Sequence, residues 1–170
     1  MSAYVAAPMK MNATRNSMHE SARVQMAETL NRRLSDVLDL QGQCKQAHWN
    51  VKGPGFMALH QMFDAVNASV GKYADLLGER VVQLGGTAEG TARHVAEFSE
   101  MDEYPAGITQ GTQHLQALSH ALATCGARLR FVIQEADELE DADTADICTQ
   151  VSRGLDQWLW MVEAHLQTSA

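Results

Sequence analysis

The feature that most limits what this chain can fold into is its lack of helix breakers. Its 170 residues contain only three prolines, Pro8, Pro54 and Pro105. Because proline interrupts helices and strands, the long stretches between these positions are free to form extended helices. Apolar residues recur at helical spacing in these stretches, and the alternation typical of strands is absent. The sequence therefore predicts an all-α protein.

This periodicity predicts four long helices and one short one. The expected ranges are about 18–48, about 56 to Gly85-Gly86, near 91–99, about 111–137, and a last helix after Asp143-Thr144. Ser17 and Glu20 have the spacing of a capping box before the first helix. Because the central connection is unusually long, the short helix should lie in a crossover. We therefore predict a ferritin-like four-helix bundle over residues 17–168, after a flexible tail over residues 1–16.

The chain is acidic, with 13 Lys+Arg against 21 Asp+Glu and a formal net charge of −8. Such a surface repels nucleic acid over most of its area and attracts cations. Its three cysteines form no CxxC pair, which indicates reduced thiols in a reducing compartment. No secretory signal pattern is present, and no apolar run approaches the ~20 residues of a membrane span. We expect a cytoplasmic protein without a membrane partner.

Two pairs of metal-ligating residue types lie on the second predicted helix. His60 and Asp64 are four residues apart, and so are Asp75 and Glu79. On a helical wheel these positions point to about 0°, 40°, 60° and 100°, so all four share one face. The gap between Asp64 and Asp75 corresponds to a rise of roughly 16 Å, which no single metal centre spans.

Two interpretations of this face are open. Each pair forms a separate weak site, or the two ends meet across a twofold axis between antiparallel copies of the helix. His48, at the end of the first helix, adds a further ligand close to the start of the second. Two imidazoles and three carboxylates suit iron or manganese and are too rich in oxygen for a structural zinc site.

These residues sit in segments that resemble the Dps family (DNA-binding proteins from starved cells). The similar segments are Lys45-Gln-Ala-His-Trp-Asn50, His60-Gln-Met-Phe-Asp64, Asp75-Leu-Leu-Gly-Glu79-Arg80, Val82-Gln-Leu-Gly-Gly86, Asp143-Thr-Ala-Asp146 and Leu159-Trp160. The resemblance covers about residues 20–166, and every ligand position holds the expected residue type. It implies a hollow homododecamer with ferroxidase sites at its twofold interfaces.

By position, the resemblance implies that His48, His60 and Asp64 of one subunit join Asp75 and Glu79 of its neighbour. Such proteins oxidise Fe(II), usually with hydrogen peroxide and also with oxygen, and store ferric mineral inside. Zinc or manganese are the expected substitute metals. Trp49, beside His48, either exchanges an electron with the iron or packs in the interface.

Two further regions carry expectations. Seven carboxylates crowd residues 135–146, which is typical of a solvated turn with capping acids or of a pore that attracts Fe(II). Asp141 and Asp146 are the candidate pore residues. The tail offers only Lys10 and Arg15 as candidate DNA contacts, so we expect weak DNA binding that fails at physiological salt. The alternative function is a nucleoid-associated, DNA-condensing protein with secondary iron chemistry.

Overall fold

Five α-helices make up most of the chain in the computed structural model, which describes residues 9–167. They are α1 (Glu20–Asn50), α2 (Phe56–Gln83), α3 (Ala92–Phe98), α4 (Gly111–Glu138) and α5 (Ala142–Ala164). The only strand-like feature within residues 9–167 is an isolated parallel bridge between Lys52 and Gln110. None of the helices in this range has the length and apolar character needed to cross a membrane. The predicted all-α architecture with a short central helix is confirmed.

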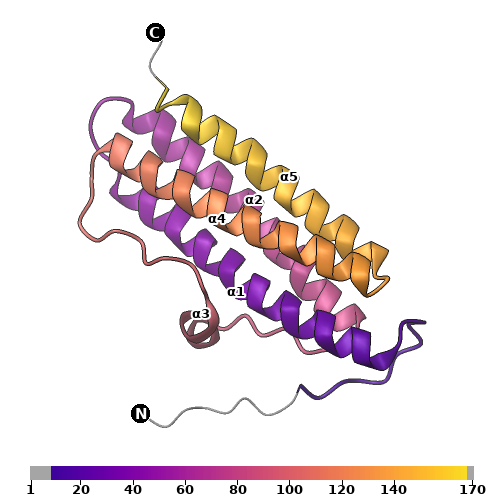
Figure 1. Ribbon diagram of the computed structural model, residues 1–170. Coiled ribbons are helices and arrows are strands. Elements are labelled where there is room, and N and C mark those ends of the chain that lie inside the picture. Colours follow the sequence, from indigo (N-terminus) through magenta and orange to yellow (C-terminus); the bar gives the residue numbers. More distant parts are fainter. Residues whose placement is uncertain (1–8, 168–170) are drawn as a thin grey trace.

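The four long helices lie side by side as two closely packed pairs, α1 with α2 and α4 with α5 (Figure 1). A short connection joins the helices of each pair, so they run in opposite directions. One end of the bundle holds the α1–α2 loop, the start of α4 and the end of α5, and the other holds the end of α2 and the α4–α5 turn (Figure 1). Apolar side chains from all four long helices fill the interior, among them Phe63, Met26, Leu118 and Leu155.

A crossover of residues 84–110 connects α2 to α4 and runs along α1 (Figure 1). Its helix α3 has no buried residue, so an apolar face does not hold it in place. Polar contacts hold it instead: the buried carboxylate of Asp36 accepts from the backbone N–H of Glu100 at 2.8 Å. Arg33 and Arg128 also contact this carboxylate, although burial raises its pKa above the ordinary value.

The first helix begins two residues later than predicted. Its N-cap is His19, whose ring nitrogen accepts a hydrogen bond from the backbone N–H of Ser21 at 3.4 Å. Ser17 is therefore not the cap, and the predicted capping box is wrong. The side chain of Asn16 accepts from the backbone N–H of Met18 at 2.9 Å, and this local turn stops the helix from starting earlier.

The cap predicted for the last helix is also wrong. α5 begins at Ala142, and its cap is Asp141, which accepts a hydrogen bond from the backbone N–H of Thr144 at 3.1 Å. A capping side chain bonds the N–H group two or three residues ahead. Asp143 therefore lies in the first turn of the helix rather than before it.

The segment before α1 contacts the end of α2. The backbone N–H of Asn12 donates to the carbonyl of Gly85 at 2.7 Å, and Met9 packs partly buried against the core. Gly85 has a φ of 94°, in the left-handed region that favours glycine, as predicted for the end of this helix. Of the tail predicted over residues 1–16, residues 1–8 lie outside the described residues, whereas residues 9–16 lie against the bundle.

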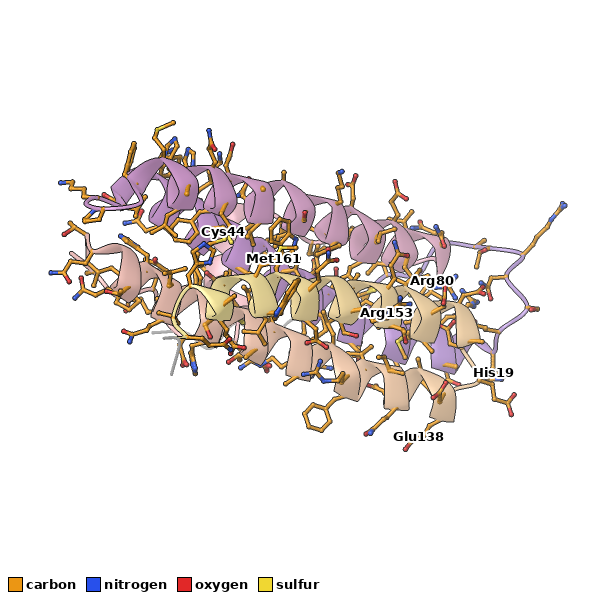
Figure 2. The ribbon with its side chains drawn as sticks, turned by 90° about the horizontal axis from the view of Figure 1, so that it is seen from above. His19, Cys44, Arg80, Glu138, Arg153 and Met161 are labelled. Atoms are coloured by element: carbon orange, nitrogen blue, oxygen red, sulfur yellow. The ribbon has the colours of Figure 1, made fainter. Side chains whose placement is uncertain are left out.

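All three cysteines are buried and free. Burial raises the pKa of the thiols of Cys44, Cys125 and Cys148 to about 12. Figure 2 shows Cys44 within the bundle, among the long helices. Because the thiolate is the reactive form, these residues fill the core and are chemically inert.

Candidate metal centre

Two histidine side chains pack against each other where the end of α1 meets the start of α2. His48 lies in the last turn of α1 and His60 near the start of α2, and their rings stack with centroids 3.7 Å apart at 20°. The Nδ1 of His48 lies 2.8 Å from the carbonyl oxygen of His60, and the Nδ1 of His60 lies 2.8 Å from that of His48. A carbonyl can only accept, so each Nδ1 carries the proton and each Nε2 keeps a lone pair for a metal.

The loop between the two helices allows the two histidine rings to meet. Gly53 and Gly55 have φ values of 93° and 78°, which let the chain reverse within the five residues between α1 and α2. The reversal places two residues twelve positions apart at stacking distance. Both rings remain partly exposed, so a cation can approach them.

Asp64 lies one turn beyond His60 and is engaged by a residue that the sequence analysis did not single out. The Nζ of Lys45 forms an ion pair with its carboxylate. The hydrogen bond from Lys45 lowers the pKa of Asp64 below its ordinary value, and it outweighs the opposing effect of desolvation. A cation binding at Asp64 therefore competes with the ammonium group of Lys45.

Asp75 and Glu79 lie further along α2, and both are exposed. They line a groove of about 700 Å³ between α1, α2 and the start of the crossover. Most of the other lining is apolar or small, with Leu34 and Leu38 from α1 and Gly78 from α2. The two carboxylates are therefore the main charged groups of this groove.

One protomer does not bring all five candidate ligands together. Within residues 9–167 no three His, Cys, Asp or Glu side chains are placed to hold a metal ion. The structure joins His48 to His60, with Asp64 nearby but turned to Lys45, and it leaves Asp75 and Glu79 in the separate groove. Neither set alone has enough ligands to complete the coordination of a metal ion, so further ligands would have to come from another subunit or from solvent.

Large apolar side chains are exposed around the histidine pair. Trp49 is 69% exposed, and Met57 and Phe56, at the start of α2, are also exposed. The ring of Phe56 lies 5.1 Å from that of His60, centroid to centroid. An exposed apolar area of this kind, beside an incomplete set of metal ligands, is typical of an interface between protein chains.

The acid-rich turn contains a buried ion pair that the sequence analysis missed. Asp141 is 2% exposed, and its carboxylate accepts from Arg80 Nη2 at 2.6 Å and from both the hydroxyl and the backbone N–H of Thr144. Arg80, on α2, is itself 5% exposed. Of the two candidate pore residues only Asp146 is exposed, because the carboxylate of Asp141 is already engaged. Figure 2 places Arg80 and Glu138 toward the same end of the bundle.

The two candidate DNA contacts are free of the core. Lys10 and Arg15 are both exposed in the segment that precedes α1. Neither forms an ion pair among the described residues. They remain the only two cations of this segment.

Comparison with known proteins identifies relatives of the whole chain. The Ferritin family, a ferritin-like domain, matches residues 27–170. The DNA protection during starvation protein of Agrobacterium fabrum is 40% identical over 159 residues, which cover 94% of this chain and 98% of that protein. Among solved structures, DpsA14 from Streptomyces coelicolor has a TM-score of 0.90 with 32% identity, covering 96% of each chain. Mycobacterium smegmatis Dps has a TM-score of 0.87 with 29% identity, covering 92% of this chain and 96% of that one.

Proposed function

Because this chain belongs to the Dps family of ferritin-like proteins, we propose that it is a mini-ferritin that oxidises Fe(II) and stores the ferric product. The observation that carries the proposal is the reciprocal hydrogen bonding of His48 and His60. It holds both imidazoles in the tautomer that leaves Nε2 available to a metal. Metal-ligating histidines commonly donate the other ring N–H to a backbone carbonyl in this way, which fixes the tautomer and the direction of the ring.

In this proposal the ferroxidase site is shared between two subunits. His48, His60 and Asp64 of one subunit supply two nitrogen donors and a carboxylate, and Asp75 and Glu79 of a twofold-related subunit supply two further carboxylates. The separation of the two sets on α2 and the groove around the second set support this assignment. Three carboxylates and two neutral imidazoles suit Fe(II) and Fe(III), with zinc or manganese as substitutes.

The proposed reaction uses hydrogen peroxide, and also oxygen, as the oxidant. Two Fe(II) ions lose one electron each, and one peroxide molecule takes up both electrons and is reduced to water. The ferric ions then hydrolyse to mineral inside a hollow dodecamer. Since the reaction consumes both Fe(II) and peroxide, it protects the cell from hydroxyl radicals. Trp49 lies beside His48, where it either exchanges an electron with the iron or packs in the interface.

The route by which Fe(II) enters is part of the same proposal. Exposed carboxylates near the α4–α5 turn, Asp146 among them, create a negative potential that draws cations toward that end of the bundle. Asp141 stabilises the turn in this scheme rather than facing a pore, because Arg80 and Thr144 hold its carboxylate.

DNA binding is the second candidate function. The names of several relatives, among them the protein of Agrobacterium fabrum, refer to DNA protection. In this chain the exposed cations Lys10 and Arg15 are the groups that would contact phosphates. Two cations per subunit, beside a net charge of −8, give an attraction that salt readily screens.

Iron oxidation by the wild type and by the His48→Ala/His60→Ala variant tests the leading function. We expect the variant to lose oxidation by about 100-fold, since both nitrogen donors are gone. Stopped-flow absorbance after mixing with Fe(II) and either peroxide or oxygen measures the rate and the preferred oxidant. A variant that oxidises Fe(II) as fast as the wild type would show that the site lies elsewhere.

A second prediction concerns Lys45. Replacing it by glutamine should raise the affinity for Zn²⁺, used as a redox-inert probe, by about tenfold, because a positive charge beside the site is removed. Asp64 is ionised at neutral pH in both proteins, because Lys45 only lowers a pKa whose ordinary value already lies well below neutral pH. The gain therefore comes from a freed carboxylate and not from a change of protonation.

Isothermal titration calorimetry measures the effect of Lys45→Gln. The matched control is Lys72→Gln, which removes the same charge from an exposed position of α2 that is not paired with Asp64. Equal Zn²⁺ affinities for the two variants would show that the Lys45 ion pair does not compete with the metal.

A further inference from the structure

A buried asparagine on α1 holds the first residues of the crossover in place. Asn31 is 5% exposed, and its Nδ2 donates to the carbonyl oxygen of Thr87 at 2.9 Å. Its Oδ1 accepts from the backbone N–H of Glu89 at 3.1 Å. One side-chain amide thus binds the backbone on both sides of Ala88.

These two hydrogen bonds are the main polar attachment of residues 87–90. The segment has no regular secondary structure, and within residues 9–167 no other side chain of the four long helices hydrogen bonds to it. The far end of the crossover is held separately: Ser99 donates to Asp39 at 2.6 Å, and Glu100 donates its N–H to Asp36. Loss of the Asn31 contacts therefore frees residues 87–90 without freeing the rest.

The segment that Asn31 holds is a wall of the groove containing Asp75 and Glu79. Ala88 and Gly90 line that groove together with the two carboxylates. A Cβ placed on Gly78, between the two carboxylates on α2, would lie 3.8 Å from the Cβ of Ala88. The wall therefore lies close enough to α2 that a side chain at position 78, between Asp75 and Glu79, would contact it.

The face of α1 beneath the wall explains why Asn31 can position it so closely. Asn31, Leu34 and Leu38 follow one another at helical spacing, so they share this face. A Cβ on Gly90 would lie 3.0 Å from Leu38 Cδ1, so Leu38 supports the segment from below. A Cβ on Gly78 would lie 3.7 Å from Leu34 Cδ2, which places Leu34 between the segment's base and α2. The amide of Asn31 fixes the position of the segment along α1.

We propose that Asn31 is a positioning residue for the Asp75/Glu79 half-site, acting through the crossover wall. The inference rests on the proposed function of these two carboxylates. Ala88 and Gly90 place apolar atoms along one side of the two carboxylates, which lowers the local dielectric there and strengthens their attraction for a cation. It also restricts the directions in which they can point, and so keeps them available to the partner subunit's half-site.

The test uses the full-length protein with two substitutions, Asn31→Leu and Asn31→Ala. Both substitutions remove the two hydrogen bonds. Leucine is larger than asparagine and alanine is smaller, so an effect seen in both variants comes from the lost hydrogen bonds and not from a change in volume. Both variants should fold, because Thr87 and Glu89 are exposed and their released backbone groups are hydrated. The control is Ser99→Ala, which removes a hydrogen bond at the other end of the crossover.

Two measurements test the attachment by Asn31 and its effect on the half-site separately. Hydrogen exchange of the Glu89 amide, which donates to Asn31 Oδ1, should become at least about tenfold faster in both Asn31 variants and stay unchanged in Ser99→Ala. Zn²⁺ affinity, measured by calorimetry, should fall by about tenfold in the Asn31 variants only. In Fe(II) oxidation, the iron concentration for half-maximal rate should rise while the maximal rate is retained, since no ligand is altered.

The possible failures are distinguishable. Unchanged exchange of the Glu89 amide in the Asn31 variants overturns the attachment by Asn31, whatever the activity of the protein. Faster exchange with wild-type Zn²⁺ affinity overturns the positioning role and leaves the proposed function standing. A wild-type protein that neither binds Zn²⁺ nor oxidises Fe(II) overturns the proposed function itself, and the positioning role with it.

Discussion

Mixed assemblies of His60→Ala and Glu79→Ala subunits should recover about a quarter of the wild-type rate of Fe(II) oxidation, although each variant alone is inactive. The reason is the division of the site between subunits. In a pair containing one subunit of each kind, one site combines both lesions and the other combines the intact His60 with the intact Glu79. Random pairing makes about half of all pairs mixed, and half of their sites are intact.

The experiment denatures the two variants together in equal amounts, refolds them and follows Fe(II) oxidation by stopped flow. A matched control mixes His48→Ala with His60→Ala. Both of these lesions lie in the same half-site, so every site in the mixture remains defective and no activity returns. Recovery in the control as well, or in neither mixture, would contradict a site shared between subunits in the proposed way.

The helices could be predicted from the sequence because their signals are local. Apolar periodicity, the scarcity of proline and the Gly85-Gly86 pair depend only on residues close together in the chain, and they placed α1, α2 and α4 to within two residues. The caps were less predictable, since several Ser, Asp and Thr residues compete for each helix start. Asp141 and His19 become caps because of the path of the residues that precede them. The spacing of residue types in the sequence does not reveal that path.

The candidate site could be predicted only in part, for a similar reason. Helical geometry alone separates His60 and Asp64 from Asp75 and Glu79, and the structure keeps the two sets apart. The stacking of His48 on His60 required the path of the glycine loop, which sequence spacing does not specify. Lys45 was missed because its partner, Asp64, lies on another helix, and charge pairs between helices leave no periodic signal.

The structure also links the end of α2 to the acid-rich turn, which predicts a large loss of stability on replacing Asp141. Asp141→Ala should lower the free energy of unfolding by about 3–5 kcal/mol, because it leaves the buried charge of Arg80 with only the longer, exposed ion pair to Asp143. Part of this loss is the missing cap of α5, worth about 1 kcal/mol. Asp141 is 2% exposed, so water cannot easily reach its position and replace its hydrogen bonds to Arg80 and Thr144.

Urea unfolding at one fixed protein concentration measures this loss, since assembly makes apparent stability depend on concentration. Asp143→Ala is the matched control: Asp143 is 83% exposed and lies 3.7 Å from Arg80 Nη1, so its loss should cost less than about 1 kcal/mol. Adding Arg80→Met to Asp141→Ala should cost less than the sum of the single losses, because it also removes the buried charge that has lost its main partner. Strictly additive losses, or equal losses for Asp141→Ala and Asp143→Ala, would mean that the buried ion pair does not tie α2 to the start of α5.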